Sequence, residues 1–140
     1  MAETLTAAEA ARVRALTERG DELADEGEFE AALDLFEQAL ELLPEPWSAH
    51  AQAQTLLFSI ADMQFLLDDF ESASDTFSAL LASFESAHEE ALPRLRLGQC
   101  LLEQGREAEA LPHLQAVLKR AGEQAFRFED PKYLDLARRA

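Results

Sequence analysis

The clearest indication of the fold is the stretch DELADEGEFEAALDLFEQALELLPEPW, Asp21–Trp47, which carries ten carboxylates and no lysine or arginine. Gly27 interrupts it near the start, and two prolines interrupt it near the end. Proline ends a helix because it removes a hydrogen-bond donor and clashes with the preceding turn. Between these points the large apolar residues share one helical stripe, which consists of Phe29, Leu33, Phe36, Leu40 and Leu43. The stretch therefore predicts two helices that meet at a turn around Gly27.

The rest of the chain also has helical periodicity. Thr6 followed by Glu9 has the spacing of a capping box, and the helix that it opens is predicted to pass through Gly20 and to stop at Gly27. Valine, isoleucine and threonine are scarce, and no strand pattern competes. Further helices are predicted over residues 30–42, 47–67, 70–84, 89–104, 107–121 and 131–139. The predicted fold class is all-α.

A repeat appears when the turn at Gly27 is aligned with Asp68 and Gly105, which begin GEFEAALDLFEQAL, DDFESASDTFSALL and GREAEALPHLQAVL. Each unit has a small residue seven positions before the turn, another five positions after it, and a large apolar residue nine positions after it. These positions are filled by Gly20, Ala61 and Gly98, by Ala32, Ala73 and Ala110, and by Phe36, Phe77 and Leu114. The small residues allow two antiparallel helices to approach closely.

This constellation resembles the tetratricopeptide repeat family, most closely in the first unit at Gly20, Gly27, Phe29, Ala32, Phe36, Ala39 and Pro44. The resemblance implies one domain, 1–140, of three antiparallel helix pairs stacked as a short solenoid. The expected units are residues 13–46, 47–87 and 88–122, followed by a capping helix over 131–139. Successive turns are 41 and 37 residues apart, against about 34 in the family. The first helix of the second unit is therefore expected to be about two turns longer than usual.

Charge is the most unusual bulk property. The formal net charge is -16, and residues 20–93 hold 18 aspartates and glutamates but no lysine or arginine. Such a surface repels a phosphate backbone, so nucleic-acid binding is not expected. It would attract a basic protein. The alternative, that the acidity only keeps a small protein in solution, stays open.

The expected environment is the cytoplasm. The single cysteine, Cys100, cannot form an internal disulfide, which suits a reducing compartment. No apolar run approaches the length needed to span a bilayer, and the N-terminus lacks a basic segment followed by an apolar one. No interaction with a membrane is expected.

No catalytic or metal-binding motif survives a test of spacing. Gly27 as the central glycine of a calcium loop would put Ala24 and Leu33 at ligand positions. His88 begins HEEAL, where a zinc-protease helix would need a second histidine at Leu92. We expect no enzyme activity, no cofactor, no metal and no small-molecule substrate.

The resemblance also implies where a partner would bind, because in this family the first helix of each pair lines the concave face. The partner-binding residues predicted in this way are Thr17, Asp21, Asp25, Phe58, Asp62, Phe65, Leu66, Leu95, Gln99, Leu102 and Glu103. Alternatively, Phe58 and Phe65 pack inside the second unit or under the C-terminal helix. Family members that bind a C-terminal carboxylate use cationic and amide donors there, and of the matching residues only Arg96 fits. The acidic outer face stays open as a second possible binding surface.

The predicted function is a module that binds, and neutralises or sequesters, a basic protein. The ending FEDPKYLDLARR is similar to the tails of small bacterial repeat proteins found beside toxins, and ten arginines against two lysines suggest a GC-rich bacterial genome. The specific hypothesis is therefore an immunity protein that blocks a toxin. A chaperone for a secreted protein and a general scaffold of this repeat type are the alternatives.

Overall fold

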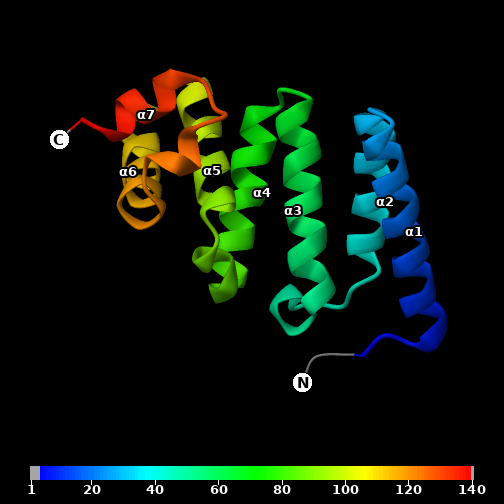
Figure 1. Ribbon diagram of the computed structural model, residues 1–140. Coiled ribbons are helices and arrows are strands. Elements are labelled where there is room, and N and C mark those ends of the chain that lie inside the picture. Colours follow the sequence, from blue (N-terminus) through cyan, green and yellow to red (C-terminus); the bar gives the residue numbers. More distant parts are fainter. Residues whose placement is uncertain (1–3, 140) are drawn as a thin grey trace. The chain divides into compact units, whose positions relative to one another are not determined.

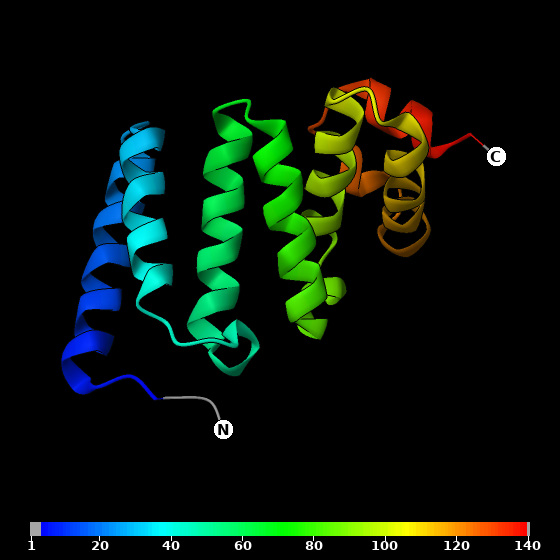
Figure 2. The same cartoon turned by 180° about the vertical axis from the view of Figure 1, so that it is seen from behind.

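The computed structural model describes residues 4–139, which form helices and connecting turns without any strand. Figure 1 and Figure 2 show these helices from opposite sides. The chain divides into two compact units, and the break lies between Asp69 and Phe70. The first unit contains α1 (Ala7–Asp25), α2 (Phe29–Glu41), the short 3-10 turn η1 (Trp47–Ala49) and α3 (Ala51–Leu66). The second contains α4 (Phe70–Ser83), η2 (Glu85–Glu89), α5 (Ala91–Glu103), α6 (Glu107–Ala121), η3 (Glu123–Phe126) and α7 (Pro131–Ala137).

The start of α1 is fixed by the predicted capping box. The Thr6 hydroxyl accepts a hydrogen bond from the Glu9 backbone N–H at 3.1 Å, and the Glu9 carboxylate accepts one from the Thr6 N–H at 2.9 Å. These bonds satisfy two of the donors that a helix N-terminus leaves unpaired. The cap hydrogen bond also lowers the pKa of Glu9.

The three aligned turns share one backbone conformation. Gly27, Asp68 and Gly105 all have positive φ, at 81°, 59° and 75°. After each of them a backbone N–H reaches back five positions into the preceding helix, from Glu28 to Leu23 at 2.8 Å, from Asp69 to Gln64 at 2.9 Å and from Arg106 to Leu101 at 2.9 Å. This is the bonding pattern of a Schellman helix end. The repeat alignment at these positions is confirmed, including aspartate in the left-handed turn, which this residue tolerates better than most.

Small residues let the paired helices approach closely within each unit. A Cβ atom added to Gly20 on α1 would lie 2.6 Å from the ring of Phe36 on α2, and one added to Gly98 on α5 would lie 2.6 Å from the Leu114 side chain on α6. Ala32 and Ala110 are fully buried. The all-α fold with helix pairs and a C-terminal helix is confirmed.

The start of α3 differs from the prediction of one helix over residues 47–67. Trp47–Ala49 is instead a 3-10 turn, closed by a hydrogen bond from the His50 N–H to the Trp47 carbonyl at 2.9 Å. The backbone is extended at His50, with φ -124° and ψ 118°, so the α-helix can begin only at Ala51. The prediction of a helix two turns longer than usual was therefore wrong, because η1 and its flanking residues absorb the extra length.

The second unit ends with a segment that returns onto its own helices. Gly122 has positive φ, at 78°, and ends α6, and η3 follows where no helix was predicted. Asp130 then caps α7 by accepting a hydrogen bond from the Lys132 N–H at 3.0 Å, as the sequence predicted. In Figure 1 and Figure 2, α7 lies across α5 and α6 near the turn that joins them. A single domain over 1–140 stays a prediction, since the break at Asp69 falls inside the expected second unit.

We expect Ala32→Leu to destabilise the protein by about 1–3 kcal/mol, because a larger side chain overpacks a fully buried contact between helices. Ala31→Leu is the matched control, since Ala31 is the preceding residue of α2 and is exposed. Its effect should stay within about 0.5 kcal/mol. Urea denaturation of both variants measures the difference. Equal midpoints would contradict the repeat alignment.

Candidate partner-binding surfaces

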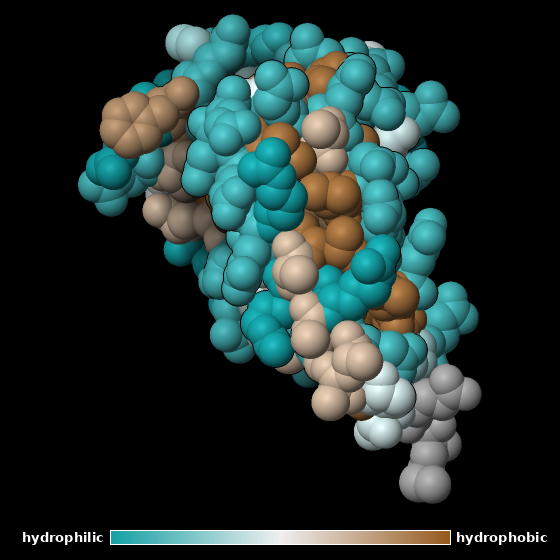
Figure 3. All heavy atoms as spheres, turned by 90° about the vertical axis from the view of Figure 1, so that its right-hand side faces the viewer, coloured by the Kyte–Doolittle hydropathy of each residue, from teal (hydrophilic) through white to brown (hydrophobic). Residues whose placement is uncertain are grey.

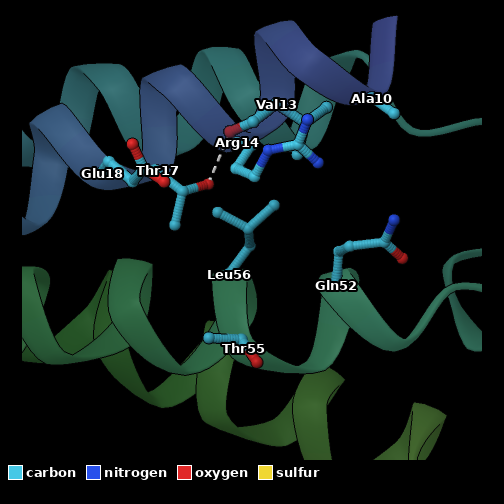
Figure 4. A pocket seen from close by; sticks show the side chains of 8 residues that line it. All are labelled: Ala10, Val13, Arg14, Thr17, Glu18, Gln52, Thr55 and Leu56. Carbon is cyan, nitrogen blue, oxygen red and sulfur yellow. Dashed lines mark hydrogen bonds between the residues drawn. The ribbon is translucent and has the colours of Figure 1, made fainter. Parts of the chain in front are cut away.

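A hollow of about 280 Å³ lies between α1 and α3 of the first unit; we call it the α1–α3 hollow. Val13 and Leu56 are buried beneath it, and Figure 4 shows Leu56 pointing from α3 toward α1. The Thr17 hydroxyl donates to the Val13 carbonyl at 2.7 Å, so this polar group is satisfied within its own helix. The floor is therefore apolar and suits an apolar side chain. The lining residues are Ala10, Val13, Arg14, Thr17, Glu18, Gln52, Thr55 and Leu56.

Carboxylates continue along α1 from this hollow toward the C-terminal end of the helix. Glu18 lies at the edge of the hollow, and Asp21 and Asp25 follow at helical spacing. Burial and the charges of Asp25 and Glu18 raise the pKa of Asp21. None of the three forms an ion pair among residues 4–139, while Arg19 pairs with Glu22 at 2.9 Å. A cation brought by a partner would relieve this repulsion.

Sequence reasoning identified Thr17, Asp21 and Asp25 on this surface but missed Arg14, Glu18, Gln52 and Thr55. A signal for two of them was present. Arg14 and Thr55 each stand six positions before the small residue of their unit, as Leu92 does in the third. Arg14 also places a positive charge at the hollow, one turn before Glu18 on α1. The lining of the hollow is therefore less uniformly acidic than composition alone indicated.

The predicted residues on α3 have mixed exposure. Phe58, Asp62 and Phe65 are half-buried, and Leu66 is 45% exposed. Half-burial is compatible both with a role in partner binding and with the alternative that the two phenylalanines pack inside. The role of these four residues stays a prediction.

The predicted residues on α5 are covered by the chain itself. Leu95 and Gln99 are buried, with 2% and 0% of their surface exposed. One oxygen of Glu129, in the loop before α7, accepts hydrogen bonds from the Gln99 amide and from the Arg96 guanidinium, both at 2.7 Å. Arg96 also donates to the Gln99 carbonyl oxygen at 2.7 Å. The carboxylate of Glu129, which belongs to the chain itself, thus lies at the face of α5 where the resemblance implied contacts with a partner.

Glu103, on the next turn of α5, is also bound by residues from the C-terminal end of the chain. The Tyr133 hydroxyl donates to the Glu103 carboxylate at 2.7 Å, and the Lys132 ammonium lies 2.5 Å from it. Leu102 is half-buried. Residues 122–139, which we call the C-terminal segment, thus engage Gln99 and Glu103, and a partner-binding role for Leu95, Gln99, Leu102 and Glu103 stays a prediction. The sequence predicted a capping helix over 131–139, but not the hydrogen bonds that Glu129 and Tyr133 form with residues about 30 positions away on α5.

The acidic outer face is the second surface that the sequence left open. Glu37, Glu41 and Glu45 surround a hollow of about 430 Å³ that Leu40, Leu43 and Trp47 also line. Burial and the charges of Asp34 and Glu41 raise the pKa of Glu37. Figure 3 looks onto the end of the first unit formed by α1 and α2, where a strip of apolar surface runs between hydrophilic side chains.

The groups considered for chemistry are engaged or buried. Cys100 is fully buried, and burial raises the pKa of its thiol to about 12, which disfavours the reactive thiolate. Within residues 4–139, no three histidine, cysteine, aspartate or glutamate side chains are placed to hold a metal ion together. Across the same residues, every helix is too short or too polar to cross a membrane.

We expect Glu129→Ala to lower the free energy of unfolding by about 2–3 kcal/mol, because it leaves Arg96 and the buried Gln99 without their shared acceptor. Glu123→Ala is the control. It removes a carboxylate from the same segment, but its pair with Arg138 is at least half exposed on both sides and is worth at most about 1 kcal/mol. Chemical denaturation compares the two, and equal losses would mean that Glu129 is not an anchor.

The ionisation of the single tyrosine, Tyr133, can be used to test its hydrogen bond to Glu103 on α5. Burial and the hydrogen bond to Glu103 raise the pKa of its hydroxyl. Because the folded-state pKa is raised, this stabilisation is present below the ordinary value of 10.0 and is lost as the pH rises through the folded-state pKa. Absorbance at ~295 nm, where ionised tyrosine is followed, should give a midpoint above that value in the folded protein. Glu103→Gln should move the midpoint downward, and an unchanged midpoint would contradict the assigned bond.

Comparisons place this arrangement among known proteins. A tetratricopeptide repeat model matches residues 13–46, and a second tetratricopeptide repeat model matches residues 64–125. No curated protein sequence matches the chain.

Solved structures with a similar fold include two bound to peptides. The Yersinia enterocolitica type III secretion chaperone SycD in complex with a peptide of the translocator YopD has a TM-score of 0.67 and 15% identity, covering 89% of this chain and 88% of that one. The first repeat domain of Spaghetti (RPAP3) bound to the HSP90 peptide SRMEEVD has a TM-score of 0.65 and 17% identity, covering 91% and 89%. YrrB, described as a TPR protein with an unusual peptide-binding site, has a TM-score of 0.60 and 23% identity, covering 74% of this chain.

The chain spans about half of the YrrB structure, 48% of its length. At these identities the likeness concerns the fold. The two family matches agree with the aligned turns, the close helix contacts at Gly20 and Gly98, and the helix pairs described above. The chain belongs to the tetratricopeptide repeat family.

Proposed function

We propose that this protein is an interaction module that binds an extended, basic segment of a partner protein along α1 and α3. One observation carries the proposal. The α1–α3 hollow offers an apolar floor, and three carboxylates without an ion pair among residues 4–139 continue from it along α1. An apolar anchor beside unpaired charges gives a partner both affinity and specificity. The peptide complexes of SycD and RPAP3 support binding of an extended segment by this fold.

The geometry of α1 defines the sequence pattern that such a segment needs. Thr17, on the side of the hollow nearest the carboxylates, and Asp25 are eight residues apart on α1. At 1.5 Å per residue this is about 12 Å. An extended chain covers that distance in about three to four residues. The proposed recognition pattern is therefore an apolar side chain with a lysine or arginine three to four positions away.

The proposed role is to neutralise or sequester the basic partner, with no catalysis and no cofactor. An immunity protein that blocks a basic toxin in the cytoplasm is the specific hypothesis, and a chaperone for a secreted protein is the alternative. The SycD likeness favours the chaperone reading, because that protein is a secretion chaperone held in complex with a translocator peptide. The two readings differ in whether the partner is folded when it binds.

A peptide display experiment tests the recognition pattern. Random extended segments selected on the full chain should be enriched for an apolar residue with a basic residue three to four positions away. Binding of a selected peptide should weaken at high salt, since charges on the surface are screened. Enrichment of acidic peptides, or an affinity that does not change with salt, would reject the acidic surface as the recognition element.

A matched pair of variants locates the surface. Asp21→Asn with Asp25→Asn should weaken binding of the selected peptide about tenfold or more, because it removes charges beside the hollow. Glu37→Gln with Glu41→Gln removes the same charge from α2 and should have little effect. The opposite result would move the site to the outer face lined by Trp47. Thermal melting should be similar for both variants, since exposed charges add little to stability.

A further inference from the structure

The second unit contains a cavity of about 230 Å³ that the partner-binding surfaces do not use. It lies where η2 meets the start of α5 and the end of α6. Two arginines and a histidine converge on it, while its walls are small apolar side chains and two glutamates complete the lining. We call it the arginine pocket, and its residues are His88, Glu89, Glu90, Ala91, Arg94, Ala116, Val117, Arg120 and Ala121.

His88 holds both arginines through neutral groups. The His88 Nε2 atom lies 2.7 Å from the Leu81 carbonyl oxygen, which can only accept, so Nε2 carries the proton. Nδ1 is then the acceptor for the Arg94 guanidinium at 3.3 Å. The Arg120 guanidinium donates to the His88 backbone carbonyl at 2.8 Å. Neither contact supplies a negative charge.

The two arginines therefore lack a counter-charge in a chain with 28 aspartates and glutamates against 12 lysines and arginines. Among residues 4–139, neither Arg94 nor Arg120 forms an ion pair, whereas four other arginines of the second unit each pair with a glutamate. Glu89 and Glu90 line the same cavity without bridging to either guanidinium. The pocket thus presents free donors in a strongly acidic protein.

The positive charge of Arg94 is also partly withdrawn from water. Its Nε atom is buried without a hydrogen-bond partner, and the side chain is half-buried between α5 and α6. Burial and the Arg94 charge together lower the pKa of His113 on α6. A buried donor without a partner and a cation without a counter-ion are both costly, and a bound anion would offset that cost.

We propose that the arginine pocket binds a carboxylate that carries a small apolar group. The carboxylate oxygens accept from Arg94 and Arg120, since a guanidinium matches carboxylate geometry. The apolar part lies against Ala91, Ala116 and Val117. Glu89 and Glu90 also line the cavity, and their charges repel a doubly charged phosphate more strongly than a monoanion. This site is on the second unit and does not depend on the function proposed for the α1–α3 hollow.

Titration of the isotope-labelled full chain with butyrate tests the proposal by nuclear magnetic resonance. The side-chain N–H signals of Arg94 and Arg120 and the ring signals of His88 should shift and saturate together. Butyramide has the same shape without the charge and should produce no saturable shift. Inorganic phosphate should bind more weakly than butyrate. No saturation with butyrate, or tighter binding of phosphate, would overturn the proposal.

Variants test the charge and the cavity separately. Arg120→Gln should weaken butyrate binding about tenfold or more, the loss expected for one charge-assisted hydrogen bond. Arg127→Gln is its control, because it removes the same charge from an exposed arginine that stacks on Phe128 outside the pocket. Ala116→Leu should abolish binding by filling the cavity without changing charge, and Glu90→Gln should tighten it. Equal effects of the Arg120 and Arg127 variants would overturn the site.

Three ligands distinguish the sources of the carboxylate. Butyrate represents a free small molecule, a blocked peptide that ends in a free valine carboxylate represents a chain terminus, and a glutamate peptide blocked at both ends represents a side chain. Tighter binding of butyrate than of both peptides assigns the pocket to a metabolite. Tighter binding of either peptide assigns it to a protein. Failure of all three to bind would reject the site.

Discussion

The close approach of paired helices at small residues is the contact on which the structure depends. The Phe36 ring lies where a Cβ of Gly20 would be, and Leu114 lies in the same way against Gly98. Such contacts leave no room for even one methyl group, so they fix the position of one helix against the next. The surfaces that remain, including the α1–α3 hollow, are set by this packing. Buried side chains that do not contact a partner therefore determine where the candidate binding surfaces lie.

The two units handle charge in opposite ways. The first has no lysine or arginine after Arg19, and the carboxylates of Asp21 and Asp25 form no ion pair among its described residues. The second carries most of the basic residues and pairs five of them internally, among them Arg96 with Glu129 and Lys132 with Glu103. Since unpaired charge favours an external partner and paired charge favours internal order, the first unit is the better candidate for attracting a basic protein.

The C-terminal segment changes what the second unit can offer. Glu129 reaches the buried Gln99 and Arg96 on α5, on the face where the family resemblance implied partner contacts. A position in a repeat thus implies a binding role only if the rest of the chain leaves that position exposed. Arg94 and Arg120 show the converse. They occupy no recognised motif, yet the fold brings them to one cavity without a counter-ion.

Most of the helices, the three turns and the residues that pack between helices could be predicted from the sequence. These features depend on local rules, since periodicity sets the buried stripe and Gly27, Asp68 and Gly105 take the left-handed turn. Helix boundaries were less secure, because the 3-10 turn at Trp47 has no local signature. The packing of the folded chain was needed to establish that Gln99 is covered, that Gln52 on α3 meets Thr17 on α1 at the hollow, and that two arginines share a cavity. Each of these depends on groups far apart in the chain, and their meeting is fixed by the packing of whole helices.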